Sequence, residues 1–208
     1  MTKETSLPAK QRIWELDALR GLCILCMVAI HAFWDLSAFG GFAFDLPGWF
    51  LFCRQYGHIL FILLSGLCAT LASRSFQRGV YVFGAALVIS YVTFFMVNVL
   101  NFPSDMLIWF GILHFLSAAV LLFALFRPLL DRISALPGLI ACALLLLLTW
   151  HMPVQKGGFF GIPGLFEWHT PSWIAACPWL YPLGLGKGTG ADYFPLLPWF
   201  FCLLAGSF

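Results

Sequence analysis

Three polar side chains in one largely apolar stretch have the types and spacing needed for acid–base chemistry. The stretch, residues 12–36, carries Arg20 near its start, His31 near the middle of its apolar part and Asp35 four residues later. On an α-helix, Arg20 and His31 fall nearly on one face, about 16 Å apart along the axis. A carboxylate that orients one imidazole nitrogen raises the basicity of the other. We therefore expect His31 and Asp35 to form a base and its orienting partner; the alternative is a structural hydrogen bond from His31.

The charged residues before the apolar run suit an anionic ligand. The planar guanidinium of Arg20 matches the geometry of a phosphate group. Asp17 either belongs to the same site, pairs with Arg20 or caps the start of the helix. Arg74, which closes the second apolar run, is a further candidate. The alternative for Arg20 is an interfacial anchor whose side chain reaches out to water.

Two more histidines, His58 and His114, lie within apolar runs and are candidates for catalysis. Ionisable side chains at membrane depth are costly and usually serve a function, so we include both. His151 and His169 fall in an expected interface or loop. The sequence has no H-x-x-x-H, no paired C-x-x-C and no cluster of acidic residues. We therefore expect no metal site.

The composition places these residues in a membrane. Of the 208 residues, 62% are hydrophobic and 10% are charged, and the mean hydropathy is +0.93. A soluble domain has roughly 45–50% apolar and about 25% charged residues, so the chain is expected to be an integral membrane protein with the lipid bilayer as its partner. A net charge of +2 without a basic, aromatic-rich patch argues against binding nucleic acid.

The apolar runs predict an all-α, polytopic membrane helix bundle with about six transmembrane helices. Residues 1–11 form a polar tail, and residues 12–208 are expected to form a single transmembrane domain. Within it, residues 37–55 are expected to form a loop and residues 152–194 an ordered cap on the membrane surface, because this segment is rich in Trp, Tyr and Pro. The last helix is expected to be incomplete, since about fourteen residues follow Phe194. The expected spans are 18–36, 56–73, 79–100, 107–126, 136–151 and this short last run.

Basic residues near the ends of the runs predict the orientation. With a cytoplasmic N-terminus, the inner segments hold seven of them: Lys3, Lys10, Arg12, Arg74, Arg78, Arg127 and Arg132. The outer segments hold three: Arg54, Lys156 and Lys187. Because basic residues concentrate on the cytoplasmic side, we expect the N-terminus inside and the cap outside.

Four segments carry a family resemblance: RIWELDALRGLCILCMVAIHAFWDL at 12–36, FILLSG at 61–66, FGILHF at 110–115 and DYFPLLPWF at 192–200. Together with the hydropathy between them, they resemble bacterial members of the heparan-α-glucosaminide N-acetyltransferase catalytic-domain family. Membrane acyltransferases of a wider group similarly begin with an Arg-Gly pair and an intramembrane His, here Arg20, Gly21 and His31.

The resemblance implies an acyl-CoA donor, typically acetyl-CoA, at the cytoplasmic face and a sugar or another small acceptor reached from the other side. It implies that Arg20 binds the donor phosphates and that His31 is the base or nucleophile of acyl transfer. It also implies a multi-pass protein of the bacterial cytoplasmic (inner) membrane. The donor is a substrate, and no permanently bound cofactor is expected.

Two other functions fit the same residues. A transporter would pass a small solute or protons along His31, Asp35 and His58, although no internal repeat supports it. A non-catalytic membrane subunit would tolerate replacement of His31 by Gln or Asn. As an enzyme, the chain would use Arg20, His58 or His114 to stabilise the oxyanion of acyl transfer. The acceptor, the acyl chain and the oligomeric state are left open by the sequence.

Overall fold

The computed structural model describes residues 13–38, 40–41, 47–150, 171–185 and 192–208. The chain forms two compact units, Met1–Phe61 (unit 1) and Ile62–Phe208 (unit 2), and each is described by itself. In the described ranges every regular element is helical, and no strand occurs. The predicted all-α, polytopic membrane helix bundle is thereby confirmed.

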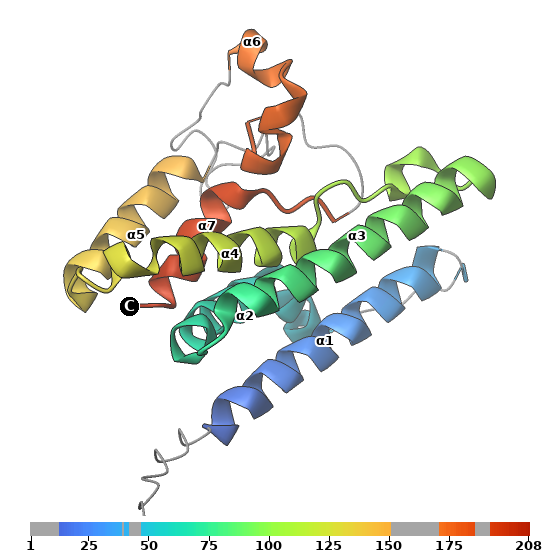
Figure 1. The fold of residues 1–208 in the computed structure, drawn as a ribbon. Coiled ribbons are helices and arrows are strands. Elements are labelled where there is room, and N and C mark those ends of the chain that lie inside the picture. Colours follow the sequence, from blue (N-terminus) through green and yellow to red (C-terminus); the bar gives the residue numbers. More distant parts are fainter. Residues whose placement is uncertain (1–12, 39, 42–46, 151–170, 186–191) are drawn as a thin grey trace, which may run out of the picture. The chain divides into compact units, whose positions relative to one another are not determined.

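Four helices are long and apolar enough to cross a membrane (Figure 1). They are α1 (Trp14–Ala38), α2 (Gly48–Leu71), α3 (Ser75–Val99) and α4 (Ile112–Leu130). Two shorter apolar helices follow, α5 (Ala135–Thr149) and α7 (Leu196–Ala205). The other elements in the described residues are the short helix α6 (Ser172–Ala175) and the 3₁₀ helices η1 (Ser104–Met106) and η3 (Pro178–Leu183).

Most helix boundaries differ from the predicted ones by a few residues, and two of the differences have a clear local reason. α2 begins at Gly48, inside the expected loop 37–55, because Pro47 precedes the first turn and its carbonyl accepts hydrogen bonds from Phe50 N and Leu51 N. Proline is tolerated at a helix start because the N–H that it lacks would have no partner within the helix there. α4 continues through Pro128 to Leu130, beyond the expected end at 126. The proline is tolerated because it lies in the last turn, where few hydrogen bonds follow it.

Unit 1 contains α1 and the first part of α2. The ring of Phe33 meets that of Phe50 edge-on, with 5.2 Å between their centroids. Trp49 packs on the same Phe50 ring at 5.8 Å. This aromatic contact joins the end of α1 to the start of α2.

Unit 2 is held together by the pairings of α3 with α4, of α5 with α7 and of α2 with α7. α3 packs along α4, where a Cβ on Gly79 would lie 2.8 Å from Leu121 Cγ. The second part of α2 crosses α7 so closely that a Cβ on Gly66 would overlap the carbonyl oxygen of Leu203. Small residues such as Gly66 allow this close contact in membrane bundles. Fully buried side chains between these helices include Ile62, Phe115, Phe123 and Leu203.

Unit 2 has a polar network at each end of its helices. The "Arg127 end" comprises residues 70–78 and 127–134, where α2 and α4 stop and α3 starts. The "His114 end" comprises residues 101–114 and 192–195, where α3 stops and α4 and α7 start. Both ends contain residues singled out in the sequence.

Candidate functional site

His31 lies in the second half of α1, and its ring is oriented by the helix backbone. Nδ1 of His31 is 2.8 Å from the carbonyl oxygen of Met27, one turn earlier. A carbonyl only accepts, so Nδ1 carries the proton and the lone pair of the neutral ring is on Nε2. The sequence analysis expected Asp35 to orient the ring; in the structure Met27 O is the orienting acceptor. Asp35 lies on the same helix, one turn further along.

Arg20 lies in the first half of α1 and has an unsatisfied donor. Its Nε is buried and has no hydrogen-bond partner among the described residues. A buried guanidinium N–H without an acceptor is costly, and an anionic ligand would satisfy it. Asp17 is in the first turn of the same helix, where its negative charge interacts favourably with the positive end of the helix dipole.

The remaining predicted catalytic histidines lie on different elements. His58 is half-buried on the part of α2 that belongs to unit 1. His114 is 5% exposed and lies in the first turn of α4, in unit 2. His31 and His58 therefore belong to unit 1, and His114 belongs to unit 2.

Both ring nitrogens of His114 take part in hydrogen bonds. The backbone N–H of Gly111 donates to Nδ1 at 3.3 Å, so the proton of the neutral ring is on Nε2. Nε2 lies 3.1 Å from the hydroxyl of Ser90 on α3, to which it donates. The Ser90 hydroxyl in turn donates to the carbonyl of Ile108 at 2.8 Å. His114 therefore joins α3, α4 and the loop between them, and has no free lone pair in this state.

Asp192 caps the start of α4 from a distant part of the chain. Its Oδ2 accepts a hydrogen bond from the backbone N–H of Ile112 at 3.1 Å. The residue has a φ of +52°, a left-handed conformation that Asp tolerates better than most residues. The approach is tight: a Cβ on Gly111 would lie 2.7 Å from this oxygen.

Tyr193 and Phe194, the two residues after Asp192, form hydrogen bonds with two further segments near the start of α4. The backbone N–H of Phe194 donates to the carbonyl of Phe110 at 3.0 Å, and its ring lies 5.5 Å from that of Phe115. The hydroxyl of Tyr193 donates to the carbonyl of Tyr181 in η3 at 2.6 Å. Burial, with the neighbouring Tyr181 second, raises the pKa of Tyr193, which keeps the phenol protonated as the donor of this bond. The motifs at 110–115 and 192–200 therefore meet at the His114 end.

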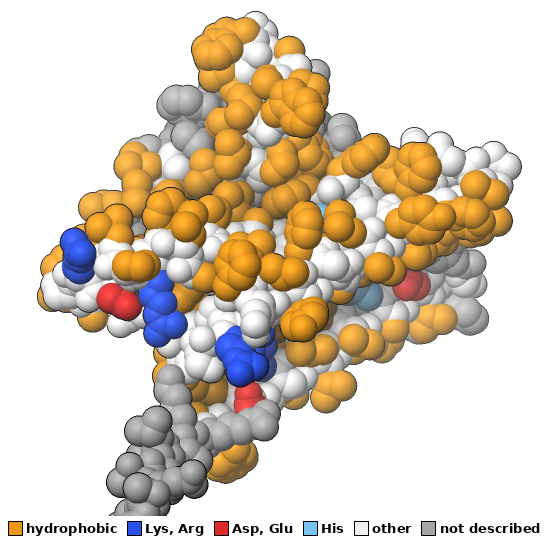
Figure 2. Space-filling model, viewed as in Figure 1, with side chains coloured by type: hydrophobic (Ala, Val, Ile, Leu, Met, Phe, Trp, Pro, Cys, Tyr) orange, Lys and Arg blue, Asp and Glu red, His pale blue; other side chains and the backbone are white. Residues whose placement is uncertain are grey.

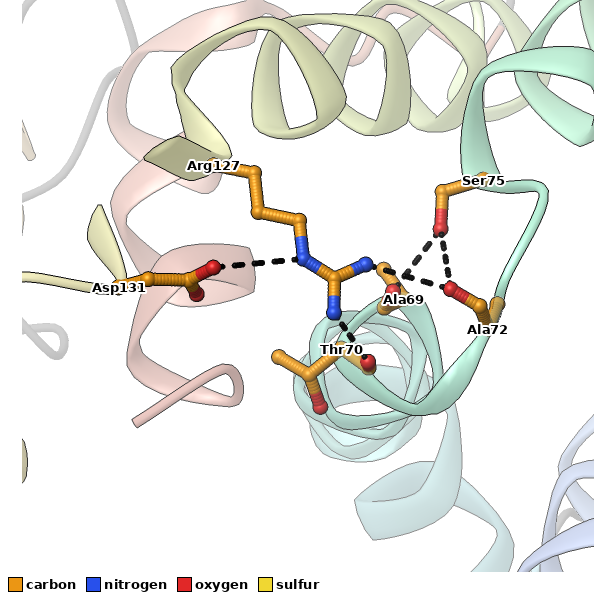
Figure 3. A network of polar contacts seen from close by, with 6 residues as sticks. All are labelled: Ala69, Thr70, Ala72, Ser75, Arg127 and Asp131. Carbon is orange, nitrogen blue, oxygen red and sulfur yellow. Dashed lines mark hydrogen bonds and ion pairs between the residues drawn. The ribbon is translucent and has the colours of Figure 1, made fainter. Parts of the chain in front are cut away.

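A different network holds the Arg127 end together (Figure 3). The guanidinium of Arg127 on α4 donates to two carbonyls at the end of α2, Thr70 O in its last turn at 3.0 Å and Ala72 O just after it at 3.3 Å. Its Nε is 3.7 Å from the carboxylate of Asp131. The hydroxyl of Ser75 donates to Ala69 O at 2.9 Å. These bonds satisfy carbonyls that the end of a helix leaves without partners.

Arg74 occupies the turn that this network fixes. It is exposed and immediately precedes the buried Ser75, with Arg78 one turn further along α3. No hydrogen bond of its side chain caps α3. The Arg74 side chain is therefore exposed, and the hydrogen bonds from Arg127 to Thr70 O and Ala72 O fix the turn just before it.

Ser90, Asp192 and Arg127 are the residues whose connecting roles the sequence analysis missed. Ser90 and Thr93 are polar residues three apart in the apolar middle of α3. Both bond Ile108: its carbonyl accepts from Ser90, and its N–H donates to Thr93 Oγ1 at 3.3 Å. This three-residue spacing was the feature of the sequence that could have predicted a shared polar contact for Ser90 and Thr93. The partners of Arg127 are main-chain carbonyls 55 and 57 residues away, which no side-chain pattern marks.

Comparison with protein families gives one match. A family model described as heparan-alpha-glucosaminide N-acetyltransferase, catalytic, covers residues 12–208. This range contains all four segments on which the resemblance was based. No curated protein and no solved structure matches the chain.

Proposed function

The chain belongs to the heparan-alpha-glucosaminide N-acetyltransferase catalytic family, and on that premise we propose that it is an acyltransferase. In this proposal it moves an acyl group, acetyl in the simplest case, from acyl-CoA to a sugar or another small acceptor. The observation that carries it is the family match over nearly the whole of an integral membrane chain. The location in the inner membrane of a bacterium belongs to the same proposal.

His31 acts as the general base. Its Nδ1–H is held by Met27 O, so the lone pair of Nε2 is available to an acceptor. Nε2 takes the proton of the acceptor hydroxyl or amine as that group attacks the thioester carbonyl of the donor. The C–S bond then breaks, and the imidazolium returns the proton to the departing thiolate. Asp35, one turn away on α1, stabilises the imidazolium while it exists.

Arg20 binds a phosphate of the donor. The supporting observation is its buried Nε, which lacks a partner among the described residues and would donate to a phosphate oxygen. Asp17, one turn earlier on α1, orients the guanidinium. Arg74 in unit 2 is an independent candidate for the same ligand, supported by its exposure on a fixed turn.

His114 has a positioning role in this proposal. A base needs a free lone pair, whereas Nδ1 of His114 accepts from Gly111 and Nε2 donates to Ser90. Removing it would loosen the start of α4 and the loop that Ser90 holds. His58 is the candidate donor to the oxyanion that forms on the acyl carbonyl.

The distribution of charge supports a cytoplasmic Arg127 end. Four arginines lie there, at positions 74, 78, 127 and 132, whereas the described residues of the His114 end include none. Because basic residues concentrate on the cytoplasmic side, the His114 end would face outward. The acceptor would then approach from the outer side of the membrane.

Equilibrium binding of acetyl-CoA to the detergent-solubilised protein tests the proposal. The comparison is between wild type, Arg20→Ala and Arg54→Ala, an exposed arginine on α2 that serves as the control. We expect saturable binding that Arg20→Ala weakens about tenfold or more and Arg54→Ala leaves unchanged, since a charged hydrogen bond contributes about 1.5–3 kcal/mol. If wild type binds no acyl-CoA, the proposal fails, and solute flux in liposomes becomes the next experiment.

A further inference from the structure

The segment from 171 to 185, here called the cap segment, exposes two large aromatic side chains. It contains α6 and η3 and has no charged residue. Trp173 is 74% exposed and Trp179 is 87% exposed. Figure 2 shows hydrophobic side chains gathered over α6. An exposed, uncharged aromatic surface of this kind is typical of a site that contacts lipid or another molecule.

The cap segment is fixed to unit 2 by its opposite side. The carbonyl of Tyr181 accepts the hydrogen bond of Tyr193, and the two rings lie 4.5 Å apart. Gly184 ends η3 in a left-handed conformation, with a φ of +89°, and is buried. The exposed tryptophans therefore belong to a segment whose other side is anchored to the start of α7.

The chain around the cap segment connects it to the membrane. It follows α5 and precedes α7, both apolar, and Trp150 just after α5 packs on Trp199 of α7 with 5.4 Å between the rings. The cap segment thus lies on the side of unit 2 where α5 ends and α7 begins. Tryptophan is enriched where membrane proteins meet the lipid headgroups, because the ring is apolar and its N–H is polar.

We propose that the cap segment lies in the lipid headgroup region, with Trp173 and Trp179 inserted among the lipids. A glycan platform would need amide, carboxylate or guanidinium groups beside its aromatic rings to bind hydroxyls. The cap segment offers only Ser172, Cys177 and Tyr181 as polar side chains. A lipid interface makes no such demand and matches a surface that is aromatic and uncharged.

Fluorine NMR tests the placement in the whole protein. The chain is labelled with 5-fluorotryptophan and reconstituted in phosphatidylcholine nanodiscs. The Trp173 and Trp179 resonances are assigned by their loss in Trp173→Phe and Trp179→Phe. Two relaxation agents are compared, a lipid with a nitroxide near the headgroup and a water-soluble gadolinium chelate. Trp199, which is 7% exposed, is the buried control.

We expect the lipid nitroxide to reduce the intensities of the Trp173 and Trp179 resonances about three times more than that of the Trp199 resonance. We also expect the nitroxide to reduce these two intensities more than the gadolinium chelate does. Strong loss with gadolinium and little with the nitroxide would overturn the proposal, since the segment would then face water. Loss with neither agent would also overturn it, because protein would then cover the tryptophans. The phenylalanine variants retain an aromatic side chain, so the assignment does not depend on a disruptive change.

Discussion

Asp192 offers a sharp test of the His114 end, because its side chain and its backbone conformation make separate contributions. The carboxylate caps α4 through Ile112 N at 3.1 Å, and the backbone has a φ of +52°. Three substitutions separate the two effects. Asn keeps an acceptor oxygen and tolerates the left-handed backbone, Gly keeps only the backbone freedom, and Ala keeps neither.

The magnitudes follow from these differences. Losing the carboxylate that caps α4 costs about 1 kcal/mol whether Ala or Gly replaces Asp192, because neither residue has a side-chain acceptor. A left-handed backbone costs Ala about 1–2 kcal/mol more and costs Gly nothing. Asp192→Ala should therefore lower the free energy of unfolding by about 2–3 kcal/mol. Asp192→Gly should lower it by about 1 kcal/mol, because only the cap is lost, and Asp192→Asn by about 0.5 kcal/mol or less.

The assay is reversible unfolding of the purified protein in mixed micelles, followed by circular dichroism. The expected order of stability is wild type, then Asn, then Gly, then Ala. If Asp192→Ala were as stable as Asp192→Asn, neither the cap nor the left-handed conformation would matter, and the description of this end would be refuted.

Three further predictions use the same unfolding assay. Gly66→Ala should lower the free energy of unfolding by about 1–3 kcal/mol because the added Cβ meets the backbone of α7. Gly84→Ala, where nothing lies within 4 Å of the added Cβ, should leave the free energy of unfolding unchanged or raise it. Equal stability of the two variants would contradict the close crossing of α2 and α7. Arg127→Ala should cost about 1–2 kcal/mol and Arg127→Lys nearly as much, since an ammonium cannot bridge two carbonyls as the guanidinium does; full rescue by Lys would show that only charge matters. His114→Phe should cost about 1–3 kcal/mol by leaving the Gly111 N–H and the Ser90 hydroxyl without their partner, and the folded fraction should retain acyl transfer, whereas inactivity of a folded variant would return His114 to the catalytic residues.

The helices were predictable from the sequence because each is a long apolar run between polar turns. The start of α2 was not, because the Gly- and Phe-rich sequence before it looks like a loop, and the helix start depends on Pro47. The meeting of the segments at 110–115 and 192–200 could not be predicted either. It depends on a backbone bond from Phe194 to Phe110 and on a carboxylate reaching Ile112 across 80 residues. Periodicity identifies which residues share a helix face, but it does not identify the neighbouring element.

The roles of the histidines also depended on contacts between elements, which the sequence does not show. Sequence placed His31 and His114 in apolar runs and treated both as catalytic candidates. The hydrogen bonds separate them: one nitrogen of His31 is bound to its own helix, whereas both nitrogens of His114 are engaged by residues of two helices. Because Ser90 is 24 residues from His114, that distinction required the folded chain.

Transfer of labelled acetyl from acetyl-CoA to a glucosamine-type acceptor by wild type, His31→Ala and Arg54→Ala tests the central claim most directly. Wild type and Arg54→Ala should transfer at equal rates. His31→Ala should be slower by about 100-fold to 10,000-fold, the usual contribution of a general base, with its affinity for acetyl-CoA unchanged. Transfer by His31→Ala at the wild-type rate would contradict the assignment of the base. Absence of transfer by wild type, for a range of amino-sugar and hydroxyl acceptors, would contradict the acyltransferase itself.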